Sequence, residues 1–202
     1  MLKSLTFSEV KEIHEVLTKF FEKSDDPISP PGIKNEGFLE SAVNRQHVGI
    51  GGHLKYSDVH SNAATLLYGI CMNHSFNNGN KRTALVSALA HLDKNEFVPK
   101  IMEDDFYQLM TNLAGHTLLD MKDEISKKVR KGHFSKKKHL TFDEEVTYIA
   151  KWLGKSTRRM VNNIKTVRLR ELKEILRENG CSVDDTASNE VRERGNSPHQ
   201  DK

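Results

Sequence analysis

The chain has few cysteines and no long hydrophobic run. Cys71 and Cys181 are the only two cysteines among 202 residues, too few for a disulfide framework or a cysteine metal cluster, so we interpret both as reduced thiols. No apolar run approaches the roughly 20 residues that a membrane helix needs, and residues 1–10 lack the apolar core of a signal peptide. The sequence therefore indicates a cytoplasmic protein with no membrane partner.

Charge changes along the chain and divides it. Residues 1–131 carry 16 Lys and Arg against 17 Asp and Glu, residues 132–180 carry 12 against 6, and the remainder carries 3 against 5. The length suits one domain of about 100 to 150 residues with a smaller appendage. We therefore predict a helical domain over 1–131, a basic linker over 132–140, a small basic C-terminal domain over 141–182 and a disordered tail over 183–202.

Helical periodicity dominates the first domain, so the predicted fold class is all-α. A capping box formed by Thr6 and Glu9 begins the first helix, which carries apolar residues at helical spacing. A second capping box, Thr141 with Glu144, begins a late helix whose apolar face holds Trp152. Further helices are predicted over 36–46, 57–72, 80–92, 103–114, 118–130 and 169–179.

The chemistry is predicted at HSFNNGNKR, residues 74–82, which leads directly into an apolar helix. Asn78 and Gly79 suit a tight turn, and the first amides of the helix that follows have no internal partner and form an anion site. Lys81 and Arg82 oppose the helix dipole there, unless a bound phosphate turns that penalty into attraction. The alternative is an ordinary solvated connection before a basic helix start.

The segment HSFNNGNKRTA resembles the signature of the Fic family, His-x-Phe-x-Asp/Glu-Gly-Asn-Gly/Lys-Arg, and its lysine form resembles the death-on-curing (Doc) branch. The resemblance extends over roughly residues 5–130, including GIKNEGFLESAVNRQ. It implies a Fic-like helical bundle in which His74 is the base that activates a target hydroxyl and Phe76 anchors the loop. It also implies that the phosphates of ATP are held by Gly79, Asn80, Lys81 and Arg82.

The chain departs from the family pattern at Asn78, where an acidic residue usually helps to hold Mg²⁺. An amide oxygen is a weaker ligand than a carboxylate for this hard cation. Gly79 is a partial departure, since Doc carries alanine there whereas relatives that transfer AMP carry glycine. The resemblance therefore implies ATP and Mg²⁺ as cofactors, with Asn78 as a weak metal ligand.

The glycine-rich segment from His47 to Tyr56 is expected to form a small hairpin. In Fic-family proteins a segment at this place is a flap that binds the target backbone as an added strand, a known mode of edge pairing. The alternative is an ordinary loop. The resemblance implies that the target-binding flap consists of Val48, Gly49, Ile50, Gly51, Gly52 and His53.

Lys81 favours phosphoryl transfer over AMP transfer, because the resemblance implies glycine at this position in AMP-transferring relatives and lysine in Doc-like proteins. The sequence thus predicts a Doc-like, toxin-type phosphotransferase that uses ATP to modify a hydroxyl of a cytosolic protein, such as a translation elongation factor. A separate antitoxin is expected, because the family's inhibitory motif is absent. The alternatives are a Fic-type AMP transferase and a catalytically weak Fic-fold regulator. RNA contact through the basic C-terminal domain is a further expectation.

Overall fold

The computed structural model describes residues 2–131 and 134–160, which fall in one compact unit, Met1–Met160. Helices dominate these residues, as the sequence predicted. The longer helices are α1 Phe7–Phe20, α2 Glu36–Asn44, α3 Val59–Met72, α4 Asn80–Lys94, α5 Glu103–Ala114, α6 Glu124–Arg130 and α7 Phe142–Ser156. The short elements are η1 Arg45–His47, η2 Leu118–Asp120, β1 Gly49–Ile50, β2 His53–Leu54, β3 Phe97–Pro99 and β4 Thr157–Arg159. None of the helices in this described part is long and apolar enough to cross a membrane.

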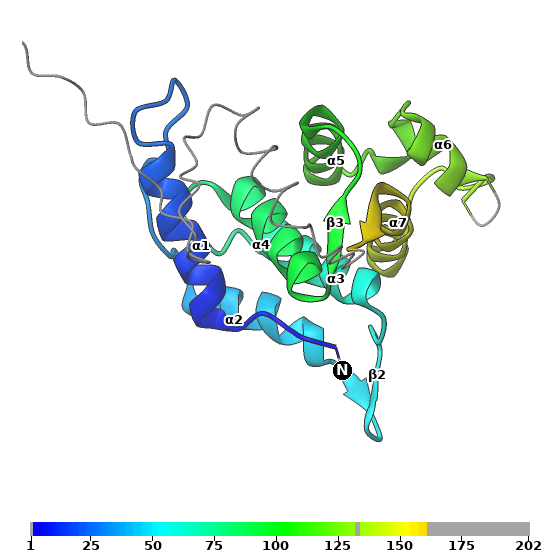
Figure 1. The fold of residues 1–202 in the computed structure, drawn as a ribbon, viewed down its shortest axis with the longest axis horizontal. Helices are drawn as coiled ribbons and strands as arrows, with labels where there is room; N and C mark the ends of the chain where they lie inside the picture. The colour runs from blue at the N-terminus through cyan, green and yellow to red at the C-terminus, as the bar shows by residue number, and fades with distance from the viewer. Residues whose placement is uncertain (1, 132–133, 161–202) are drawn as a thin grey trace, which may run out of the picture. The chain divides into compact units, whose positions relative to one another are not determined.

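Helix α3 lies at the centre of the core and packs against α2, α4 and α7 (Figure 1). Every residue of α3 from 62 to 71 is buried. Helix α1 packs against the opposite side of α4 and begins at the predicted capping box, in which Thr6 and Glu9 satisfy each other's backbone amides. The central position of α3 and α4 fixes the ends of the connection between them, residues 73–79.

Helix α7 belongs to this core, because it packs on α3 and buries its predicted apolar face. Trp152 is fully buried and meets the ring of Phe106 edge-on at 5.5 Å between centroids. The sequence-based division placed residues 141–182 in a separate domain, whereas the compact unit continues to Met160. The reason is that the apolar face of α7 covers α3, which would otherwise be exposed to solvent. Residues 161–202, including the predicted helix over 169–179 and the predicted tail, lie outside the described residues.

Two small antiparallel strand pairs flank the helices. In the first, Gly49 and Ile50 of β1 pair with Leu54 and His53 of β2, which confirms the predicted hairpin. Gly51 and Gly52 have φ angles of +60° and +80°, as two-residue hairpin turns require. The second pair joins β3 to β4 and was not predicted. It ties the end of α4 to the end of α7.

Candidate active site

The turn that connects α3 to α4 holds the predicted catalytic histidine. His74 has a φ of +48°, which ends α3 and redirects the chain, and its side chain is exposed. The carbonyl of the next residue, Ser75, accepts hydrogen bonds from the amides of Lys34 and Asn35 at 2.8 and 3.1 Å. These bonds hold the backbone beside His74 while its imidazole stays accessible to solvent.

Phe76 is 1% exposed, and its backbone forms a bridge with Ile33. Its ring stacks on the imidazole of His14, with 4.0 Å between centroids and 17° between planes. Burial of a whole aromatic side chain in a polar turn fixes the turn to the core. This position fits the anchoring role that the sequence predicted for Phe76.

The Asn80 side chain closes the turn. Its Oδ1 accepts a hydrogen bond from the Phe76 amide, and its Nδ2 donates one to the Phe76 carbonyl, both at 2.9 Å. The sequence predicted that Asn80 holds phosphate, but both ends of its carboxamide already bind backbone groups. The structure therefore gives Asn80 a role in shaping the site.

Gly79 is the N-cap of α4 and has a φ of +75°, a conformation that favours glycine. A Cβ at this position would lie 2.9 Å from Cδ1 of Ile28. Helix α4 has no side-chain cap, so the amides of its first turn lack partners within the helix and point outward. This is the geometry of an anion site. The glycine is needed for its backbone conformation and for its contact with Ile28.

The two basic residues of the first turn of α4 differ in their surroundings. The Lys81 side chain is exposed, and no hydrogen bond or ion pair engages it within the described residues. The Arg82 guanidinium donates from Nη1 to the Asp26 carbonyl at 2.7 Å and lies 3.6 Å from the Asp26 carboxylate. It also lies over the Phe21 ring at 4.7 Å. In this arrangement Lys81 is available to an anion, whereas Arg82 must first leave Asp26.

Asn78 does not have the surroundings of a metal ligand. Its Oδ1 accepts a hydrogen bond from the Gly79 amide at 2.6 Å, and its Nδ2 donates to the Ser29 carbonyl at 2.8 Å. Within residues 2–131 and 134–160, no group of three or more His, Cys, Asp or Glu side chains is arranged to hold a metal. The protein side chains alone do not form a complete magnesium site, and a nucleotide-bound magnesium ion would take most of its ligands from the phosphates.

A loop over residues 26–33 forms the second wall of the site, which sequence reasoning missed. It contributes the contacts of Asp26, Ile28 and Ser29 already described. In addition, the Asn77 amide donates to the Gly32 carbonyl at 3.0 Å and its side chain to the Pro31 carbonyl at 3.1 Å. The only local sign was the density of prolines in this segment, which predicts a rigid loop but not its partner.

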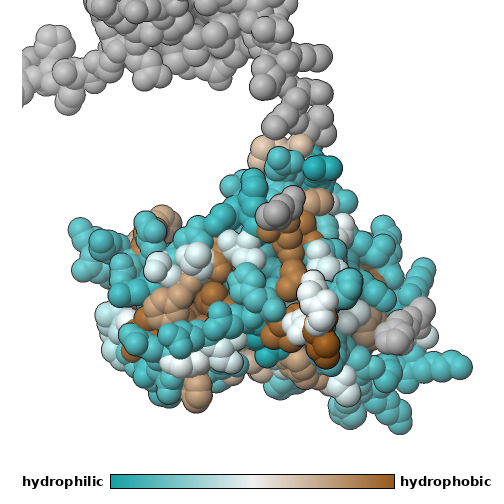
Figure 2. All heavy atoms as spheres, turned by 90° about the horizontal axis from the view of Figure 1, so that it is seen from below, coloured by the Kyte–Doolittle hydropathy of each residue, from teal (hydrophilic) through white to brown (hydrophobic). Residues whose placement is uncertain are grey.

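The flap hairpin presents apolar side chains to solvent. Ile50 is 90% exposed, and Val48 and Leu54 are also exposed. Figure 2 shows one face of the molecule, where separate apolar areas interrupt a largely hydrophilic surface. The base of the hairpin is tied to α7, because Lys55 Nζ lies 2.7 Å from Oδ1 of Asp143.

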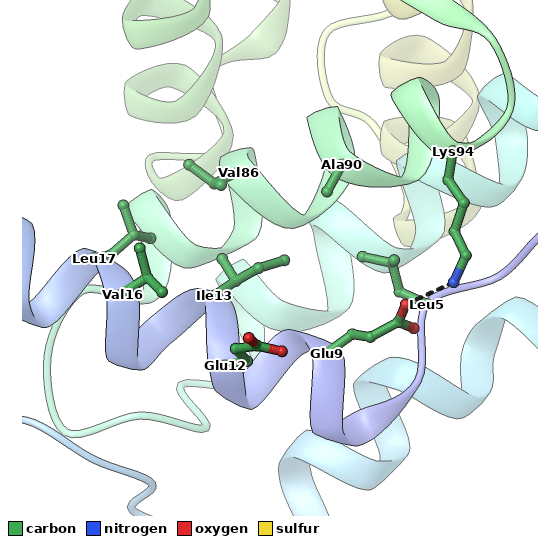
Figure 3. Close-up of a pocket in the computed structure, with 9 residues that line it drawn as sticks. All are labelled: Leu5, Glu9, Glu12, Ile13, Val16, Leu17, Val86, Ala90 and Lys94. Carbon is green, nitrogen blue, oxygen red and sulfur yellow. Dashed lines mark hydrogen bonds and ion pairs between the residues drawn. The ribbon is translucent and has the colours of Figure 1, made fainter. Parts of the chain in front are cut away.

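A cavity of about 370 Å³ lies elsewhere, between α1 and α4. Figure 3 shows apolar side chains along it and the ion pair of Glu9 with Lys94, 2.7 Å apart, at one end. The hydrogen bond from Lys94 lowers the pKa of Glu9. None of residues 74–82 lines this cavity, so the cavity is not part of the candidate site.

Cys71 lies near the end of α3, just before the turn. It is buried, and burial raises the pKa of its thiol to about 11. A thiol in this state is not a nucleophile at neutral pH. The structure agrees with the interpretation of Cys71 as a plain reduced thiol, and Cys181 lies outside the described residues.

Fold and site together define a helical domain in which an exposed histidine precedes an uncapped, lysine-bearing helix N-terminus. Residues 4–92 match the model of the Fic/DOC family. Domains of this family are generally nucleotide-dependent transferases. The match runs from before α1 to near the end of α4 and includes all of residues 74–82. It identifies the Fic/DOC family and does not distinguish its branches. No curated protein matches the chain.

Proposed function

We propose that this protein transfers the terminal phosphoryl group of ATP to a hydroxyl of a cytosolic protein, in the manner of the Doc-like branch. One observation carries the proposal: His74 in the turn and Lys81 in the first turn of α4 both have exposed side chains. Beside them lie the first amides of α4, which have no partner within the helix and which no side chain of the N-cap residue Gly79 caps. This arrangement supplies a base, an anion site and a cation in one place.

The proposed reaction begins when the imidazole of His74 takes the proton of a Ser or Thr hydroxyl on the target. The hydroxyl oxygen forms a bond to the γ-phosphorus, and the bond from that phosphorus to the bridging oxygen breaks. ADP leaves with the electron pair. Lys81 and the amides of α4 stabilise the negative charge, since such transfers depend mainly on positioning and electrostatics.

Arg82 contributes to this step if it exchanges Asp26 for a phosphate. The Asp26 carboxylate is 89% exposed, and exposed ion pairs contribute only about 0 to 1 kcal/mol. A triphosphate carries more charge than one carboxylate and accepts bidentate hydrogen bonds from a guanidinium. The ion pair with the Asp26 carboxylate is therefore weak enough for a nucleotide to replace, and the phosphate oxygens would also replace the Asp26 carbonyl as the acceptor for Nη1.

The flap from Val48 to His53 is proposed to receive the target, with the exposed edge of the hairpin available to pair with an extended segment. The exposed Ile50 side chain would contact an apolar residue of that segment. A translation elongation factor is the proposed target, and a separate antitoxin is the proposed inhibitor.

Transfer of AMP is the second candidate, favoured by Gly79, which matches AMP-transferring relatives and leaves the α4 N-terminus without a side-chain cap. A third candidate is a catalytically weak Fic fold that serves as a regulator or as an RNA-contacting module. It is favoured by Asn78, whose carboxamide is already hydrogen-bonded at both ends, and by the 12 Lys and Arg against 6 Asp and Glu in residues 132–180. The candidates differ in whether the γ-phosphoryl group, the AMP group or no part of ATP is transferred to the target.

The test uses ATP labelled at either the α or the γ phosphate, incubated with the full chain, MgCl₂ and a purified elongation factor, and in parallel with cell extract. Label from the γ position on a protein supports the proposal, and label from the α position supports AMP transfer. Absence of both supports the regulator.

His74→Ala should abolish the labelling. The matched control is His139→Ala, which removes another exposed imidazole and should label like the wild type. If His74→Ala labels as well as the wild type, His74 is not the base.

A further inference from the structure

His14 is a buried histidine for which neither the motif nor the proposed reaction has a use. It lies on α1, is 2% exposed, and is 60 residues before His74 in the chain. Sequence reasoning treated α1 as an ordinary amphipathic helix. The surroundings of this imidazole, however, connect three separate segments of the site.

Each ring nitrogen of His14 has one partner. The Gly32 amide donates to Nε2 at 3.1 Å, so Nε2 carries no proton and Nδ1 carries it. Nδ1 then donates to Oγ1 of Thr83 at 3.0 Å. The neutral form with its proton on Nδ1 is the one that satisfies both contacts.

The third contact is the stack of the imidazole on Phe76. Gly32 belongs to the loop that forms the second wall, Phe76 anchors the turn, and Thr83 lies in the first turn of α4. One side chain thus fixes the distances among the wall, the anchor and the helix whose amides form the anion site.

The neutral state of His14 follows from its surroundings. Burial lowers its pKa, and the nearby Glu15 carboxylate opposes this shift more weakly. The groups that its ring contacts, the Gly32 amide, the Thr83 hydroxyl and the Phe76 ring, carry no charge. A protonated ring would place an N–H against the Gly32 N–H, and that contact would be lost.

We infer that His14 is a positioning residue for the site: its imidazole, bound to Gly32 and Thr83 and stacked on Phe76, holds the turn and the 26–33 loop in the geometry that presents His74 and the α4 amides. The inference rests on the proposed function for its catalytic consequence. The contacts by which His14 couples the 26–33 loop, the turn and α4 can be measured even in a protein that shows no activity.

The test compares His14→Phe, which keeps a ring against Phe76 but loses both hydrogen bonds, with His14→Gln, whose terminal amide retains an acceptor for the Gly32 amide. Hydrogen exchange of the amides of Gly32 and of residues 76–80 should accelerate by about tenfold in His14→Phe and much less in His14→Gln. Transfer of label from ATP should fall by about 10- to 100-fold in turnover rate in His14→Phe, with a smaller change in the KM for ATP. Thr83→Val, which removes only the Nδ1 partner, provides a milder second variant if His14→Phe fails to fold.

The control is His91→Gln, which disturbs another buried imidazole on α4, hydrogen-bonded to Asn62 at 2.9 Å, and should leave exchange in residues 76–80 unchanged. Wild-type exchange of these amides in both His14→Phe and Thr83→Val overturns the inference. Wild-type turnover in a His14→Phe protein with accelerated exchange also overturns it. If the wild-type chain transfers no label, the proposed function fails, and the exchange measurement still decides the role of His14.

Discussion

Replacing Asn80 by alanine tests whether this side chain shapes the turn or holds phosphate. The substitution removes two hydrogen bonds, one to the amide and one to the carbonyl of Phe76. Each such bond contributes about 0.5 to 1.5 kcal/mol, so we expect the free energy of unfolding to fall by about 1 to 3 kcal/mol. In a domain of this size that corresponds to a decrease in Tm of roughly 2 to 12 °C.

The assay is urea unfolding followed by the fluorescence of Trp152, the only tryptophan in the chain, which is fully buried on α7. Asn112→Ala is the matched control, since it also removes two side-chain hydrogen bonds, one from Nδ2 to the Gln108 carbonyl and one from Oγ1 of Thr117 to Oδ1, but at an exposed place on α5. We expect the control to change the unfolding free energy by less than about 0.5 kcal/mol. An Asn80→Ala protein with unchanged stability and weakened ATP binding would refute the assignment of Asn80 to the turn.

Three further predictions follow from other contacts. Trp152→Ala should lower the free energy of unfolding by about 3 to 5 kcal/mol, measured by circular dichroism in urea; a change below about 1 kcal/mol would show that α7 is not part of the core. Burial lowers the pKa of His91 from 6.5 to about 4. Between pH 4 and pH 6.5 this imidazole is therefore protonated in the unfolded chain and neutral in the folded protein. The neutral His91 contributes to the free energy of unfolding above pH 6.5, and this contribution should be lost, by on the order of 3 kcal/mol, as the pH falls toward 4. The His91→Gln protein should lose less stability over this pH range in urea titrations. If its stability falls with pH as steeply as that of the wild type, His91 is not the group responsible. Asp26→Asn should tighten ATP binding by up to about fivefold, because it removes the carboxylate that competes for Arg82, and isothermal titration should show no such gain for the control Asp25→Asn.

The sequence was sufficient to predict features whose cause is local. The capping box of Thr6 and Glu9 and the period of the apolar residues predicted α1, and the same signals predicted α7. Glycines in series predicted the hairpin, because two successive residues with positive φ angles are needed there. The motif predicted a helix that begins after Gly79 and carries Lys81 and Arg82 in its first turn, and α4 begins there.

Features that depend on distant segments were not predictable in this way. The strands β3 and β4 pair although about sixty residues separate them, and each is only three residues long, so neither shows a period. The partners of Arg82 and His14 are distant in the chain: Arg82 meets Asp26, which lies 56 residues before it, and His14 meets Gly32 and Thr83. The predicted domain boundary at residue 141 differs from the end of the compact unit at Met160. The change in charge along the chain reflects surface residues, whereas the apolar face of α7 packs into the core.

The motif residues differ in what a substitution should do. Phe76, Gly79 and Asn80 each have a structural partner in the core, in the 26–33 loop or in the turn itself. In contrast, no hydrogen bond or ion pair engages the side chains of His74 and Lys81 among the described residues. Much of the motif's sequence is therefore required to fold the turn, because a tight connection with two left-handed residues, His74 and Gly79, must be held on several sides. Substitution of His74 or Lys81 should remove activity from a protein of unchanged stability, whereas substitution of the other three should lower stability and activity together.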